Sequence, residues 1–89
     1  MLTLRIENPC AKDIKLLKKR GKDLNKLWSV IDRLQKQQPL DSRYRPHRLK
    51  GNWYPAWECH IEPDWLLIYT ITGDFLYLVR TGTHADLFE

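Results

Sequence analysis

The stretch Trp65-Leu66-Leu67-Ile68-Tyr69-Thr70-Ile71 decides the fold. Nearly every residue in it is apolar, which is typical of a strand in the middle of a sheet that is covered on both faces. Turn sequences bound it, with Pro63-Asp64 on one side and Thr72-Gly73-Asp74 on the other. The stretch therefore predicts a central strand, with another strand preceding it and another following it.

The two flanking segments have the composition of strands. Residues 57 to 62 alternate apolar and polar side chains, the period of a strand with one buried face. This alternation places His60 on the polar face, between Glu58 and Glu62. After the central run, residues 75 to 79 predict a further strand that ends in Arg80 and leads into a short tail.

The first half of the chain is mainly helical. Alternation over residues 2 to 6 predicts a strand, and a helix follows near residues 9 to 20, with Asn8 as its cap and Gly21 as its stop. A second helix begins after Asp23 and ends before Pro39. Its apolar stripe consists of Leu24, Leu27, Trp28, Ile31 and Leu34.

These elements predict one α+β domain over residues 1 to 89, in the order β-α-α-β-β-β. The two helices form a helical hairpin that must cover a small sheet with their apolar stripes. No apolar run approaches the roughly 20 residues that span a bilayer, so no membrane partner is expected. The N-terminus lacks the pattern of a signal peptide, and we expect a cytoplasmic protein with two reduced thiols.

Charge is distributed unevenly along the chain. Residues 1 to 50 hold fourteen lysines and arginines against five acidic residues, a net charge of +9, whereas residues 51 to 89 have a net charge of −5. The lysines of the first helix fit a solvated helix face. Residues 37 to 55 read as a long basic loop, a kind of segment that is usually functional. We expect its cations to bind the phosphates of a nucleic acid. They are Arg45, Arg48 and Lys50, with Arg43 beside them.

All three histidines, His47, His60 and His84, lie in the second half of the chain. Imidazole exchanges protons near neutral pH, so three of them together suggest acid-base catalysis. Zinc binding is the chemical alternative, because His47, His60, Asp64 and His84 are all zinc-type ligands. Their spacing matches no recognised zinc signature, and the neighbouring arginines would repel a cation.

Three segments carry a family resemblance. They are Arg45 to Gly51, His60 to Tyr69 and Arg80 to Phe88, and together with the order of elements they resemble the YafQ branch of the RelE/ParE toxin superfamily. The second and third segments are specific, because they combine unusual residues at fixed separations. The N-terminal strand and helices resemble the family only in pattern.

The resemblance implies a bacterial type II toxin, an endoribonuclease that cuts mRNA on the ribosome and is silenced by a cognate antitoxin. It implies that no metal or other cofactor is needed. The site positions that match the family are His47, His60, Asp64 and His84 as catalytic residues, with Arg80 and Phe88 as substrate-binding residues.

Chemistry suggests a division of roles among these residues. Our hypothesis is that His47 is the general base and His84 the general acid, while His60 and Arg80 hold the scissile phosphate and Asp64 orients a histidine. Phe88 would either stack on a base or dock the tail onto the sheet.

The expected partners are polyanions and one protein. We expect a monomer when the toxin is free, a hetero-oligomer with an acidic antitoxin, and binding to the ribosome and its mRNA. Two alternatives remain open at this stage. One is a ParE-like toxin that binds DNA gyrase, and the other is a nucleic-acid-binding module without catalysis.

Overall fold

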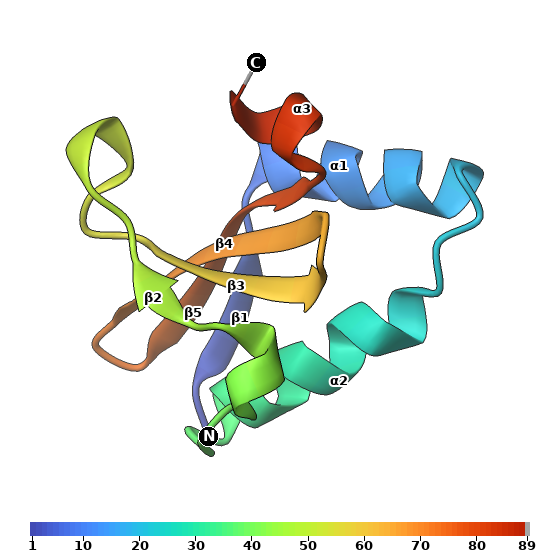
Figure 1. Ribbon diagram of the computed structural model, residues 1–89. Helices are drawn as coiled ribbons and strands as arrows, with labels where there is room; N and C mark the ends of the chain where they lie inside the picture. The colour runs from blue at the N-terminus through green and yellow to red at the C-terminus, as the bar shows by residue number, and fades with distance from the viewer. Residues whose placement is uncertain (89) are drawn as a thin grey trace.

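The computed structural model describes residues 1–88 and has the predicted α+β architecture (Figure 1). Its strands are β1 (Thr3–Ile6), β2 (His47–Arg48), β3 (Trp57–Glu62), β4 (Trp65–Thr72) and β5 (Phe75–Gly82). Its α-helices are α1 (Asn8–Lys19), α2 (Leu24–Gln35) and α3 (His84–Phe88), with short 3₁₀ turns η1 (Ser42–Tyr44) and η2 (Gly51–Trp53).

The sheet has the strand order β1-β5-β4-β3-β2. Only β1 and β5 pair in parallel, and the three other pairs are antiparallel. The central strand β4 is covered on both faces, as its apolar run predicts. Trp65, Leu67 and Tyr69 belong to the larger core under α1 and α2, whereas Leu66 and Ile68 belong to a smaller core on the opposite face.

The two long helices lie on one side of the sheet and diverge from each other (Figure 1). Helix α1 packs chiefly against β5 and α2 against β3. Asp23 caps α2 as predicted, because its carboxylate accepts a hydrogen bond from the Asn25 amide. Gly21 takes the expected left-handed conformation after α1, at φ 80°. The predicted cap of α1 was wrong by one residue, since Asn8 is already helical and Glu7 occupies the cap position.

Two further predictions need correction. The segment from residue 37 to 55 is not a continuous loop, because it contains η1, η2 and the strand β2, which adds a fifth strand to the sheet. The short tail predicted after Arg80, for which no helix was expected, contains the helix α3 over His84–Phe88. A two-residue strand and a helix of about one turn are too short to show a periodic pattern in sequence.

The buried stripe of α2 differs from the prediction at two positions. Trp28 is 38% exposed, whereas Val30 is buried with Leu27, Ile31 and Leu34. Both cysteines are buried and unbridged, and burial raises the pKa of the Cys10 and Cys59 thiols to about 12. Within residues 1–88, no helix is long and apolar enough to cross a membrane.

Candidate active site

Strand pairing brings the three histidines to one end of the sheet. His47 of β2 lies opposite Glu58 of β3, and His60 lies opposite Leu66 of β4. Leu66 in turn lies opposite Gly82, which precedes His84 by two residues. The three imidazoles therefore form a row, with ring centroids 6.2 Å apart for His47 and His60 and 6.0 Å apart for His60 and His84.

Backbone carbonyls fix the orientation of two of these rings. Nδ1 of His47 lies 2.9 Å from the carbonyl oxygen of Arg45, and Nδ1 of His60 lies 3.3 Å from that of Pro63. A carbonyl oxygen can only accept a hydrogen bond, so Nδ1 is the protonated nitrogen in both rings. Nε2 of each ring then points to Oε1 of Glu58, 3.4 Å away in both cases.

Glu58 is the residue whose importance sequence reasoning missed. Its side chain is only 7% exposed, although strand alternation places it on the polar face. A buried carboxylate is costly unless donors or cations compensate it. A proton on Nε2 of His47 or His60 would make that contact a charge-assisted hydrogen bond. The available signal was its place two residues before His60 on the same strand face.

Glu62, the other acidic neighbour of His60, does not join this cluster. The β3–β4 register shifts between His60 and Glu62, which directs the Glu62 carboxylate towards α2. There it accepts hydrogen bonds from Nζ of Lys22, at 2.8 Å, and of Lys26, at 2.7 Å. Of the two acidic neighbours predicted for His60, only Glu58 therefore faces an imidazole.

Asp64 holds the third histidine. Its Oδ1 accepts hydrogen bonds from the His84 amide, at 2.9 Å, and from Nδ1 of His84, at 2.6 Å. The hydrogen bond from the His84 backbone amide, followed by that from its imidazole, holds the pKa of the Asp64 carboxyl below its ordinary value. Because Nδ1 is bound to a carboxylate, Nε2 of His84 is the nitrogen left for chemistry.

An ion pair anchors α3, which carries His84. Arg20 at the end of α1 donates to both oxygens of Asp86, at 2.7 and 3.1 Å, and Asp86 also accepts from the Thr83 amide. The Arg20 hydrogen bonds, followed by that of the Thr83 amide, hold the pKa of the Asp86 carboxyl well below its usual range. Gly82 allows this close approach, since a Cβ there would lie 2.9 Å from Oδ2 of Asp86.

Aromatic rings extend the row of imidazoles beyond His84. The Phe88 ring centroid lies 6.4 Å from that of His84 and 5.8 Å from that of Trp53, which it meets edge-on. Phe88 remains 43% exposed. It therefore contacts the η2 segment and still presents surface to solvent, which is compatible with both roles predicted for it.

The predicted RNA-binding cations occupy different surroundings. Arg45 has a left-handed backbone at φ 47°, and its carbonyl is the acceptor for His47. The Arg48 guanidinium lies over Trp57 at 5.1 Å, and Lys50 caps η2 at an exposed position. Arg80 forms a two-bond ion pair with Asp13 of α1, through Nε at 2.6 Å and Nη2 at 3.0 Å. That pair ties β5 to α1 and leaves Nη1 as the remaining guanidinium nitrogen.

His47, Glu58 and His60 could also hold a metal ion. One ligand atom from each residue lies within 4.8 Å of the other two. Two imidazoles and a carboxylate suit zinc or copper, and a Nδ1–H bonded to a carbonyl is the usual outer support of a histidine ligand. The donor set therefore fits a divalent cation, and it uses the same Nε2 atoms that face Glu58.

Comparisons with known proteins agree on one family. Residues 2–89 match the family model described as bacterial toxin of type II toxin-antitoxin system, YafQ. The mRNA interferase toxin YafQ of Escherichia coli K12 is 47% identical over 79 residues, which cover 88% of this chain and 86% of that protein.

Two solved structures are similar over almost their whole length. A copper-bound mutant toxin from Helicobacter pylori is 43% identical, with a TM-score of 0.95 and coverage of 99% of this chain and 100% of that one. The DinJ–YafQ complex of E. coli is matched at 40% identity, with a TM-score of 0.91 and full coverage of both chains.

The ion pair of α3 yields a pH-dependent prediction. Because the pKa of Asp86 is lowered by folding, its contribution to stability is present above the unfolded carboxyl pKa of about 3.9 and is lost as the pH falls further. We expect Asp86→Asn to lower the free energy of unfolding by about 1 kcal/mol at pH 7, a value typical of a partly exposed ion pair. The deficit should shrink below about pH 4, where the Asp86 carboxyl of the unfolded parent chain binds a proton that the folded chain does not.

Urea unfolding at pH 7 and pH 3 measures this difference. Asn can still accept the Thr83 amide, so the substitution isolates the charge. Arg20→Gln should cause a similar loss, and the double variant should lose no more than either single one. Equal stability of parent and Asp86→Asn at pH 7 would contradict the anchoring role of the pair.

Proposed function

The chain belongs to the YafQ family of type II toxin-antitoxin toxins, and on that basis we propose that it is an mRNA interferase, an endoribonuclease that cuts translated mRNA on the ribosome without a metal cofactor. One observation carries the proposal. Three imidazoles lie in a row with neighbouring ring centroids about 6 Å apart, and the carboxylates of Glu58 and Asp64 contact them. Such a row can serve two proton transfers at a single phosphate.

The reaction requires three functions. A base removes the proton of the 2′-hydroxyl, which attacks the adjacent phosphorus, and an acid protonates the departing 5′-oxygen. Positive donors stabilise the charge that develops on the phosphate. The products are a 2′,3′-cyclic phosphate and a 5′-hydroxyl, and the proton lost at one oxygen is balanced by the proton gained at the other.

His84 is proposed as the acid and His47 as the base, because they stand at opposite ends of the row. The Asp64 hydrogen bond fixes Nδ1–H of His84, so a second proton on Nε2 is directed away from the carboxylate and can be donated. His60 lies between them and is proposed to hold the phosphate through its own Nε2. Arg80 would assist through Nη1, since Asp13 engages its other donors.

The partners follow from charge and from the relatives. One E. coli relative is complexed with the antitoxin DinJ, and we propose that this toxin likewise forms a hetero-oligomer with a cognate acidic antitoxin. The net charge of +9 on residues 1 to 50 suits an acidic chain and ribosomal RNA equally. The ribosome would hold the mRNA across the row of imidazoles and so supply the reaction geometry.

The test is cleavage of an mRNA on programmed ribosomes in the presence of EDTA. We expect discrete cuts within translated codons by 5′-end mapping, and a loss of roughly 10²- to 10⁴-fold in the single-turnover rate for His84→Ala. Asp64→Asn should also be slow, because an amide no longer offers a negative acceptor to the charged imidazole. Thermal unfolding of each variant serves as the control for folding.

Two outcomes would redirect the assignment. Growth arrest without RNA cleavage would favour the gyrase-binding alternative, and this can be tested with purified gyrase. Toxicity that survives His60→Ala and His84→Ala would favour a non-catalytic nucleic-acid-binding module.

A second candidate ligand at this site is a divalent metal ion. The copper-bound H. pylori relative and the donor set of His47, Glu58 and His60 favour it. In this proposal the ion inhibits, because it takes the Nε2 atoms that would otherwise carry protons or contact phosphate. Bound zinc or copper would replace the protons on these imidazoles and so block the acid-base chemistry.

We expect Cu²⁺ to bind the purified toxin in titration calorimetry and to suppress cleavage, while EDTA restores the full rate. Glu58→Gln should weaken copper binding at least tenfold, since it removes the anionic ligand. A control substitution on the far sheet edge, Arg5→Gln, should leave copper binding unchanged. Stimulation of cleavage by copper, or copper binding that Glu58→Gln leaves intact, would contradict this assignment.

A further inference from the structure

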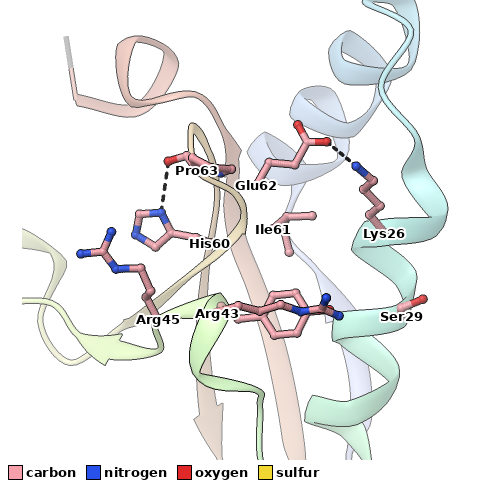
Figure 2. Close-up of a pocket in the computed structure, with 9 residues that line it drawn as sticks. Lys26, Ser29, Arg43, Arg45, His60, Ile61, Glu62 and Pro63 are labelled. Atoms are coloured by element: carbon pink, nitrogen blue, oxygen red, sulfur yellow. Dashed lines mark hydrogen bonds and ion pairs between the residues drawn. The ribbon is translucent and has the colours of Figure 1, made fainter.

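A pocket of about 460 Å³ opens beside His60, the middle ring of the row of imidazoles (Figure 2). Its walls come from α2, from η1 with the residue after it, and from the end of β3 with its following turn. The residues that matter for its chemistry are Lys26, Arg43, Tyr44, Arg45, His60 and Glu62. Its volume is on the scale of a small-molecule binding site.

The pocket has the charge of an anion site. Three cations line it against one carboxylate, that of Glu62. That carboxylate is already matched by two lysines, Lys22 and Lys26, whose hydrogen bonds hold its pKa below the ordinary value. The guanidinium groups of Arg43 and Arg45 therefore set the local potential, and a phosphodiester is attracted to it.

The pocket also offers a stacking surface. The Arg43 guanidinium lies over the Tyr44 ring, 4.8 Å from its centroid, and donates a hydrogen bond to the Tyr44 hydroxyl at 2.8 Å. Arg43 itself is exposed, so this planar group is available to a flat ligand. Unpaired RNA bases stack on guanidinium planes as well as on aromatic rings.

Arg45 links the pocket to the row of imidazoles. Its side chain lines the pocket and rises beside His60 in Figure 2. Its backbone takes a left-handed conformation, unusual for a residue other than glycine, and presents the carbonyl that orients His47. Arg45 thus lines the pocket with its side chain and orients His47, the proposed base, with its carbonyl.

We propose that this pocket binds the nucleotide on one side of the scissile phosphate, with its base stacked on Arg43, while Phe88 and Trp53 receive the base on the other side. This inference rests on the proposed ribonuclease function. His60 and His84 then lie between two base-binding surfaces, and the phosphate that joins the two nucleotides lies over His60. The experiment below determines whether the nucleotide in the pocket lies on the 5′ or the 3′ side of the cut.

An acidic segment of the antitoxin is the competing occupant. The nucleotide is favoured because His60 belongs both to the pocket wall and to the row of imidazoles. The carboxylates of an acidic peptide would pair with the cations but would not stack on the planar Arg43–Tyr44 surface. A nucleotide uses both, since it carries a phosphate and a flat base.

The experiment removes bases one at a time from the substrate. Short synthetic mRNAs that lack the base at each position flanking the cut are placed on ribosomes, and the single-turnover rate is measured for the parent, Arg43→Gln and Arg43→Lys. Arg43→Lys keeps the charge and loses the plane. Arg5→Gln is the matched control, because Arg5 is an exposed arginine over an aromatic ring, Phe75, on the opposite edge of the sheet.

For the parent, we expect removal of the base on the pocket side to slow cleavage by about 5- to 150-fold, the range that corresponds to one stacked base. Arg43→Gln and Arg43→Lys should cut intact mRNA more slowly and lose no further rate when that base is removed. Both variants should keep the parent's sensitivity at the position read by Phe88, and Arg5→Gln should match the parent throughout.

The outcomes separate this inference from the function on which it rests. A parent that cuts no mRNA defeats the proposed function itself. A parent that cuts, with Arg43 variants that retain full sensitivity to base removal, overturns the pocket assignment alone. Arg43→Gln that cuts normally but escapes neutralisation by the cognate antitoxin would also overturn it, and would assign the pocket to the antitoxin.

Discussion

A carboxylate with almost no exposure to solvent, that of Glu58, holds the centre of this site together. It faces Nε2 of both His47 and His60 at 3.4 Å, and backbone carbonyls bind the opposite nitrogen of each ring. A charge buried to this degree is costly without compensation. The two imidazoles that can compensate it are positioned by strand β2, by the carbonyl of Arg45 and by the turn at Pro63. The same arrangement makes the cluster suitable for either protons or a metal ion, which compete for the same atoms.

The remaining parts of the site depend on sheet register. His60, Leu66 and Gly82 lie across three adjacent strands, and a slip of one residue would turn each side chain to the other face. Helix α3 continues from this register and is anchored to α1 through Arg20 and Asp86. The basic first half of the chain therefore contributes to the site in two ways, by supplying cations to the pocket beside His60 and by anchoring the helix that carries His84.

The parts of the fold that could be predicted from sequence are those with a long periodic or apolar signal. The run after Trp65 predicts the doubly covered β4, and Asp23 and Gly21 mark the helix ends because their chemistry is local.

The missed features are either very short or depend on residues far away in sequence. Strand β2 is too short to show a period, Glu62 finds its lysine partners 36 and 40 positions away, and Arg80 meets Asp13 across 67 positions. The burial of Glu58 could not be predicted, because it depends on tertiary packing around β3, where strand alternation indicates only a polar face. The histidines could be singled out as residues, whereas their spacing and their common carboxylate required the structure.

The division of labour along the row of imidazoles can be tested with a single substitution in the substrate. An mRNA with sulfur in place of the 5′-bridging oxygen at the cut releases a thiolate, which needs no protonation to depart because thiols are far more acidic than alcohols. If His84 is the general acid, His84→Ala should cut this mRNA at close to the parent's rate while it remains slow on the oxygen substrate, and His47→Ala should be slow on both. Equal slowing of His84→Ala on the two substrates would contradict the account.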